Sequence, residues 1–171
     1  MSMNAALAAK LKMDMDQKMS PNFKLGEFYV PNDIGPTWRT RSGGDSTYPP
    51  IPAPELIVSL EVIRAQAGGF PLIIGSGVRS VEHNRAVDGS SNSGHMKGAG
   101  ADISIRRADD GRWMNNIELG RFIKDLYRAG RLEFLAYSYL IVGKTGTRVH
   151  IGVDREVRRS TIWGAGYEKV A

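Results

Sequence analysis

The sequence predicts an α+β fold in which helices flank a small antiparallel sheet. Segments that carry apolar residues at helical spacing, or that are bounded by helix caps, are found at residues 4–19, 54–67, 81–87 and 116–129. Short apolar or alternating runs typical of strands are found at residues 70–74, 100–106, 133–142 and 148–154. A five-residue turn, Gly143–Thr147, separates the last two runs, so they are expected to pair as a hairpin.

The N-terminal segment is expected to be an amphipathic helix. Leu7, Leu11, Met15 and Met19 share one face of residues 4–19, and lysine and aspartate fill much of the remainder. Such a stripe is more typical of a docking surface than of a cofactor site. We therefore expect residues 1–19 to form an arm and residues 20–171 to form a single domain, which suits the length of the chain.

The next segment is expected to be irregular. Residues 23–29 read as a short amphipathic element, and residues 31–52 are rich in proline, glycine, serine and threonine, as in a long ordered loop. Trp38 and Tyr48 could line a groove for substrate or pin this loop to the core. Pinning is the favoured interpretation.

The central elements follow from caps and turns. Pro54 suits the first turn of the helix at 54–67, Gly68-Gly69 suits its end, and Ser80 is the expected N-cap of the helix at 81–87. In the strand at 100–106, alternation places Asp102 and Ser104 on one face and the apolar residues on the other. The same alternation at 148–154 turns His150 away from the core.

The last helix and the tail complete this series. Residues 109–112 are expected to form a turn, after which Asn115 or Asn116 caps the helix that runs to about residue 129. The tail after Asp154 shows no clear pattern. Its two glycines, Gly164 and Gly166, are flanked by Trp163 and Tyr167, and this pattern predicts neither a helix nor a strand.

Composition excludes several classes of function. The chain of 171 residues has no cysteine, which excludes disulfides, thiolate metal sites and cysteine nucleophiles. No apolar run approaches the roughly 20 residues of a membrane-spanning helix, and the charged N-terminus does not resemble a secretory signal. The net charge of +5 favours an anionic partner. Cell-wall polymers suit it better than nucleic acid, because no nucleic-acid-binding motif is present.

Three residues point to a metal site. His95 and Asp102 lie seven apart around the glycine-rich turn Gly98–Gly100, and His150 lies within an apolar strand-like run. Two neutral imidazoles and one carboxylate would leave one open position on a tetrahedral zinc ion, as in catalytic rather than structural sites. Taken singly, each residue is better explained as a loop, turn or core residue. Their combination favours zinc binding.

The motifs around these residues resemble the M15 peptidases, which are zinc D,D-carboxypeptidases and L-alanyl-D-glutamate endopeptidases of bacteria and their phages. The resemblance runs from about Ser20 to Asp154, and its closest form is the compact single domain of phage lysins and virion proteins. The matching motifs are Ser-Gly-x-Arg-Ser at 76–80, Glu-His-Asn-Arg-Ala-Val at 82–87, Ser-x-His-x-x-Gly-x-x-x-Asp at 93–102 and Val-His-Ile at 149–151.

This resemblance implies an architecture, a cofactor and an activity. The fold would be that of the hedgehog and D,D-peptidase group, and the zinc ligands would be His95, Asp102 and His150. Arg79 would hold a substrate carboxylate or the developing oxyanion, a task that suits its fixed fork of donors. Ser93 would contact substrate or brace the His95 loop, and His83 is expected to pack or cap within its helix.

The resemblance also shows departures. The general base of well-studied members, an acidic residue three before the last histidine, is here Thr147, and the His-x-Asp pattern of compact members has Gly152 at its third position. Asp154 lies on the correct face but about 13 Å along an extended strand from His150. The other carboxylates available as bases are Glu133 and Glu82.

Two functions therefore compete at this stage. The first is a zinc peptidase that cuts peptidoglycan stem peptides or cross-bridges beside a D-amino acid, as an endolysin or a wall-degrading part of a bacteriophage virion. The second is an M15-like structural or wall-binding virion component with impaired catalysis, docked to other virion proteins through residues 4–19. Both readings place the protein in the host cytoplasm, with delivery to the wall, or in a phage particle.

Overall fold

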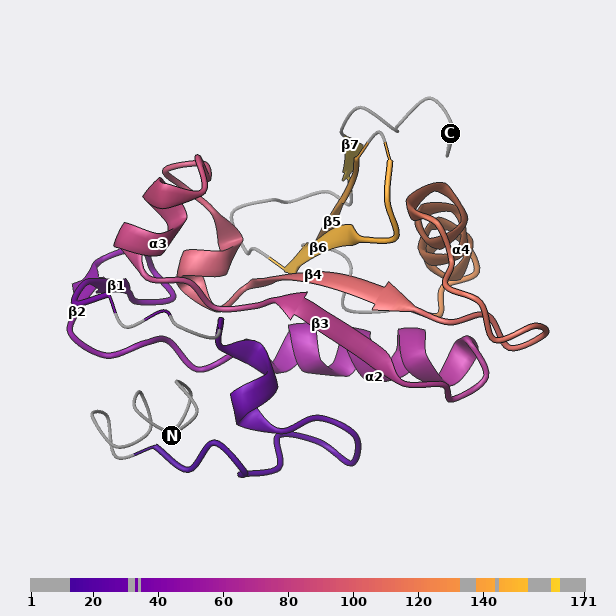
Figure 1. The fold of residues 1–171 in the computed structure, drawn as a ribbon, viewed down its shortest axis with the longest axis horizontal. Coiled ribbons are helices and arrows are strands. Elements are labelled where there is room, and N and C mark those ends of the chain that lie inside the picture. Colours follow the sequence, from indigo (N-terminus) through magenta and orange to yellow (C-terminus); the bar gives the residue numbers. More distant parts are fainter. Residues whose placement is uncertain are drawn as a thin grey trace. The chain divides into compact units, whose positions relative to one another are not determined.

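The computed structural model describes residues 13–30, 33, 35–132, 138–143, 145–153 and 161–163. The chain forms two compact units. The first comprises residues 1–57 and 76–101, and the second comprises residues 58–75 and 102–171. Figure 1 follows the elements along the chain, which passes from one unit to the other within continuous helices and strands.

The first unit holds short elements around the 31–52 loop. They are the 3-10 helices η1 (Leu25–Phe28) and η2 (Gly94–Lys97), the strands β1 (Trp38–Arg39) and β2 (Asp45–Ser46), the helix α3 (Val81–Ala86) and the start of α2 (Pro54–Gln66). β1 and β2 pair antiparallel within the loop. Trp38 is 1% exposed, which confirms that it pins the loop, whereas Tyr48 is 64% exposed and does not.

The second unit is built on a sheet. Its strands lie in the order β3 (Leu72–Ser76), β4 (Gly100–Ile105), β6 (Val149–Val153), β5 (Ser138–Val142) and β7 (Thr161–Trp163). β5 and β6 form the expected antiparallel hairpin, while β7, in the tail that showed no pattern, pairs parallel with β5. The helix α4 (Asn116–Arg128) packs against β5 and β6. The α+β class is thus confirmed, with one parallel pair added.

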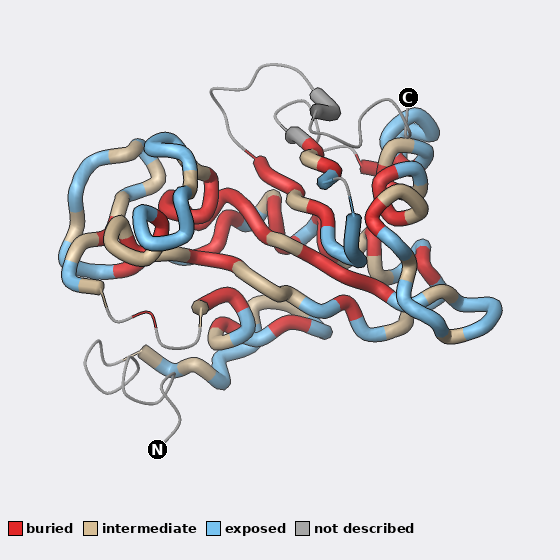
Figure 2. Tube along the Cα trace, turned by 45° about the horizontal axis from the view of Figure 1, so that its top comes forward, coloured by how far each residue is buried: buried red, intermediate tan, exposed pale blue. Residues whose placement is uncertain are grey.

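In β4 and β6, apolar residues that face the core alternate with the candidate ligands Asp102 and His150, as expected. On β6, Val149, Ile151 and Val153 are at most 2% exposed. On β4 the residues flanking Asp102 are fully buried, namely Ala101 and Ile103. Figure 2 shows the corresponding contrast on α4, where buried and exposed stretches alternate along the helix. Asp102 and His150 therefore stand on strands whose apolar residues anchor them in the core.

The start of α4 is held by a cluster of charges. Asn115 caps the helix by accepting hydrogen bonds from the N–H groups of Ile117 and Glu118, and Glu118 in return accepts from the N–H of Asn115. Arg112 donates to both carboxylate oxygens of Glu118. The hydrogen bond from Arg112 is the main reason that the pKa of Glu118 falls from 4.5 to about 2.

We expect Glu118→Gln to lower the Tm at neutral pH and to make no difference in strong acid. A carboxylate whose pKa is depressed in the folded state stabilises the protein above its ordinary pKa of 4.5, and this contribution disappears as the pH falls towards 2. Glutamine preserves the capping bond, so the substitution isolates the charge. Thermal unfolding at several pH values measures the difference, which salt should reduce because the cluster is exposed. A difference in Tm that is independent of pH would contradict this account.

The expected N-terminal helix is wrong for residues 13–19, and residues 4–12 lie outside the described part of the chain. Met15 and Gln17 use their carbonyls to accept hydrogen bonds from Gly26 and Leu25, and Lys18 forms a β-bridge with Lys24. These bonds to η1 and its flanks take the place of the i to i−4 bonds of a helix. The apolar spacing of the segment therefore did not indicate its backbone conformation.

Other predictions concern residues outside the described part of the chain. The segment 133–137 of the expected strand at 133–142 lies outside this part, as do the candidate bases Glu133 and Asp154. Among the described residues, no helix is long and apolar enough to cross a membrane.

Candidate metal centre

His95 is presented by a single turn of 3-10 helix. The Oγ of Ser93 caps η2 by accepting a hydrogen bond from the N–H of His95 at 3.3 Å. Gly98 closes the turn in the left-handed conformation, with φ of 67°, which glycine adopts without strain. His95 is only 4% exposed. Local sequence thus explains both how the turn starts and how it ends.

The ring of His95 is oriented by a backbone carbonyl. Its Nδ1 lies 2.6 Å from the oxygen of Gly77, 18 residues earlier in the chain. Because a carbonyl only accepts, Nδ1 must carry the proton, and a neutral ring then has its lone pair on Nε2. This arrangement is the usual support for a metal-bound histidine, in which a second group fixes the tautomer.

Gly77 is suited to this task because it has no side chain. A Cβ at this position would lie 2.1 Å from the carbonyl oxygen of Phe28, which itself accepts a hydrogen bond from the N–H of Val78. Any larger residue would displace the strand-like segment that aims the Gly77 carbonyl at His95. The glycine of the Ser-Gly-x-Arg-Ser motif is therefore explained by close backbone packing.

Asp102 and His150 meet across two strands of the sheet. Asp102 lies on β4 and His150 on β6, and the Nδ1 of the imidazole is 2.9 Å from Oδ1 of the carboxylate. Their side chains are 24% and 13% exposed, respectively, so both are accessible but largely shielded. Close contact between a carboxylate and an imidazole also occurs when both bind one cation.

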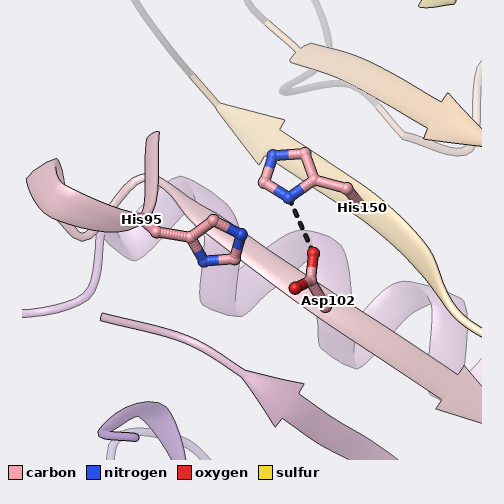
Figure 3. A group of neighbouring side chains, drawn as sticks. All are labelled: His95, Asp102 and His150. Atoms are coloured by element: carbon pink, nitrogen blue, oxygen red, sulfur yellow. Dashed lines mark hydrogen bonds and ion pairs between the residues drawn. The ribbon is translucent and has the colours of Figure 1, made fainter. Parts of the chain in front are cut away.

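His95 completes a set of three potential ligands. One ligand atom from each of His95, Asp102 and His150 lies within 4.8 Å of the others, and Figure 3 shows the ring of His95 directed towards Asp102. Ligand atoms around a tetrahedral zinc ion are about 3.3 Å apart, given bonds of about 2.0–2.1 Å. The donor types, the His95 tautomer and the spacing thus fit a zinc ion with three protein ligands.

Arg79 is tied to the same histidine. Its backbone N–H donates to the carbonyl of His95 at 3.1 Å, and its Nε donates to the Oγ of Ser76 at 2.8 Å. The guanidinium is therefore held in one orientation by its own loop. Such a fixed fork of donors is what binding of a carboxylate or oxyanion requires.

The other predicted residues have mainly structural contacts. The Oγ of Ser93 braces the His95 turn, and the N–H of His83 binds the Oγ of Ser80 at the start of α3. Glu82 accepts a hydrogen bond from the N–H of Thr37. Burial by itself raises the pKa of Glu82, but hydrogen bonds from Thr37 and from the backbone N–H of Glu82, together with the charge of Arg85, lower it overall. A carboxylate engaged in this way is a poor candidate for the general base.

Thr147 lies in the turn before β6, as expected from the sequence. Its carbonyl accepts a hydrogen bond from the Oγ of Ser104 at 2.9 Å, and the residue is exposed. The neighbouring Gly146 accepts from the N–H of Asn116. The turn is thus anchored to β4 and α4, while position 147 itself has room for a small acidic side chain.

Sequence reasoning missed two supporting residues, Gly77 and Ser76. Both lie in the Ser-Gly-x-Arg-Ser motif together with Arg79, and this motif is the sequence feature from which they could have been found. Their roles depend on a carbonyl and a hydroxyl that meet His95 and Arg79 only in the folded chain.

One comparison with known proteins identifies the family. The sequence profile described as Peptidase M15 matches residues 27–131, which is more than half of the chain. The matched region contains Arg79, Ser93, His95 and Asp102, and it ends before His150. No curated protein matches the sequence. With the histidines and the aspartate gathered as described, the match establishes that this chain belongs to the M15 family of peptidases.

Proposed function

We propose that this protein is a zinc-dependent peptidase that cleaves peptidoglycan at a stem-peptide or cross-bridge bond next to a D-amino acid. The observation that carries the proposal is the group of His95, Asp102 and His150, whose ligand atoms lie within 4.8 Å of one another. Family membership supports the peptidase part. The zinc ion and the wall substrate are our inference from the donor set, the motifs and the charge.

The residues of the chain would divide the work as follows. A zinc ion held by the three ligands would act as a Lewis acid on the scissile carbonyl and lower the pKa of its water to about 7. Gly77 keeps the lone pair of His95 on Nε2. Arg79, held by Ser76, would bind the substrate carboxylate or the charge that develops on the carbonyl oxygen.

The charge of the protein fits a wall substrate. A net charge of +5 favours association with anionic polymers such as those of bacterial cell walls. We propose that the protein reaches this substrate as a phage endolysin or as a wall-degrading part of a virion. In both cases it would act on stem peptides rather than on nucleic acid.

Hydrolysis of purified cell walls tests the proposed function. The protein is incubated with walls of several peptidoglycan types, in a zymogram and in solution, with and without a chelator. We expect clearing that the chelator abolishes and added zinc restores, and mass spectrometry of the released peptides identifies the bond. Clearing that is unaffected by the chelator would contradict the zinc mechanism, and no hydrolysis of any wall would contradict the proposed activity.

A second candidate function is supported by position 147. With threonine in place of an acidic residue, the protein could be a wall-binding or structural virion component that retains the M15 fold and has lost efficient turnover. This candidate predicts binding to walls and to zinc without hydrolysis. A substitution at position 147 separates the two functions.

We expect Thr147→Asp to raise peptidase activity at least about tenfold if catalysis is limited by a missing base. General-base assistance contributes about 10²–10⁴-fold, so tenfold is a cautious share. The turn can accept the change because Thr147 is exposed and Ser104 binds its backbone carbonyl rather than its side chain. Initial rates of wall hydrolysis at equal zinc content measure the effect.

Thr145→Asp is the matched control, since it adds the same charge to the same exposed turn. A gain confined to position 147 supports a missing base. An active wild type that Thr147→Asp leaves unchanged or inhibits would show that another group already serves as base. Inactivity of wild type and variant with zinc bound would favour the structural function.

A further inference from the structure

Asp33 is a buried carboxylate that the proposed function does not use. It is 4% exposed, and both of its oxygens accept hydrogen bonds from Ser80: Oδ2 from the backbone N–H and Oδ1 from the hydroxyl, each at 2.6 Å. Oδ1 also accepts from the N–H of Gly35 at 3.2 Å. The carboxylate of Asp33 is therefore buried, and it binds a serine that lies 47 residues further along the chain.

Residues that follow Asp33 also bind the start of α3. The carbonyl of Thr37 accepts from the N–H of Val81, and the N–H of Thr37 donates to Glu82. Gly35 packs so closely that a Cβ would lie 2.3 Å from the Oγ of Ser80. Asp33, Gly35 and Thr37 therefore bind the first residues of α3 through backbone and side-chain contacts, which fixes the end of the loop that precedes the helix.

The segment 76–80, which starts at the last residue of β3 and includes that loop, carries the support of the metal centre. Gly77 contributes the carbonyl that faces Nδ1 of His95, and Arg79 contributes the N–H that binds the carbonyl of His95. At its far end, Ser80 is bound by Asp33. One short loop thus connects the buried carboxylate with the ring and the backbone of a predicted zinc ligand.

We propose that Asp33 is a positioning residue for the metal centre. By binding Ser80, it keeps segment 76–80 in a fixed position next to η2. In that position the carbonyl of Gly77 fixes the tautomer of His95, and the guanidinium of Arg79 keeps one orientation. The inference rests on the proposed function only for the role of Arg79 towards substrate. Its effect on the ring of His95 is a property of the protein without metal.

Asp33→Asn is the informative substitution because it keeps the size and removes one acceptor. An amide has one oxygen, so it cannot accept from both the N–H and the hydroxyl of Ser80 on separate oxygens. The NH₂ group would face a donor at one of these positions. A buried polar group that loses its partner is costly, so the loop is expected to shift rather than tolerate the mismatch.

The test is the tautomer of His95, measured on the metal-free protein. Long-range ¹H–¹⁵N spectra at alkaline pH distinguish a ring protonated at Nδ1 from one protonated at Nε2. We expect the wild type to show Nδ1–H and Asp33→Asn to show a mixture of both forms. Zinc Kd, obtained by competition with a chelator, is expected to rise about tenfold, at the lower end of the usual effect of outer-shell changes.

Asn115→Ala is the matched control. It removes the N-cap of α4 in the other compact unit, so it lowers the Tm without touching segment 76–80. We expect its His95 tautomer and its zinc Kd to match the wild type. If Asp33→Asn does not fold, Ser80→Ala replaces it, because that variant keeps the backbone bond to Asp33 and should shift the tautomer in the same direction by less.

The outcomes separate this inference from the proposed function. An unchanged His95 tautomer in Asp33→Asn, with only the Tm lowered, would overturn the positioning role, as would a wild type without Nδ1–H. Failure of the protein to hydrolyse any wall would reject the peptidase proposal and leave the tautomer result standing. Loss of Nδ1–H in Asp33→Asn, but not in Asn115→Ala, would support the inference.

Discussion

A protein that carries both His95→Ala and His150→Ala is expected to lose its zinc completely. The wild type should bind about one zinc ion per chain through two imidazoles and one carboxylate. With both histidines removed, Asp102 is the only member of the group left, and a single carboxylate does not hold zinc at low concentration. Elemental analysis after dialysis measures the metal, and peptidase activity should disappear with it.

His83→Ala is the matched control for this experiment. His83 is the only other histidine in the chain, and its N–H and carbonyl form backbone hydrogen bonds at the start and the end of α3. It should retain one zinc ion per chain and full activity. Stoichiometric zinc in the double variant, with its fold intact by circular dichroism, would refute the assignment of the ligands.

The second large effect is expected at Arg79. Arg79→Lys should lower kcat/KM by about 10²–10³-fold, the usual cost of removing one donor to a developing oxyanion, while zinc content stays unchanged. Lysine cannot reproduce a planar fork of donors, and it also lacks the Nε that binds Ser76. Kinetics on a soluble stem peptide, combined with zinc analysis, measure the loss.

The split between kcat and KM shows what Arg79 binds. A rise in KM alone would indicate uniform binding of a substrate carboxylate, and a fall in kcat would indicate contact with charge that develops in the transition state. Arg85→Lys is the control, since Arg85 is exposed on the neighbouring α3. A lower Tm for Arg79→Lys with unchanged activity per folded molecule would show that the arginine is only structural.

Local chemistry explains why much of the fold could be predicted from sequence. Asn115 caps α4 and Ser80 caps α3 as expected, because a cap needs only a side chain and the N–H groups two or three residues away. The burial of Val149 and Ile151 follows from strand alternation, which also turns His150 outward. The ligand set was accessible for a related reason, since the chain has only three histidines and no cysteine.

Local sequence patterns did not predict the backbone conformation where distant residues supply the hydrogen-bond partners. Residues 13–19 have apolar residues at helical spacing, yet Met15 and Gln17 bind Gly26 and Leu25 instead of forming helical turns. Helix propensity and periodicity are weak preferences that tertiary hydrogen bonds override. The parallel strand β7 was missed because it pairs with β5, a strand about 20 residues earlier, and a pairing partner at that distance leaves no local pattern in the sequence.

By itself, the sequence determined the α+β class, the caps of α3 and α4, the faces of β4 and β6, and the identity of three candidate ligands. Only the tertiary structure decided how those ligands are supported. Three hydrogen bonds provide this support. They join Gly77 to His95, Asp102 to His150 and Asp33 to Ser80, which are 18, 48 and 47 residues apart in the sequence, respectively. Such contacts have no local signature, because they depend on where the packed core brings distant backbone segments together.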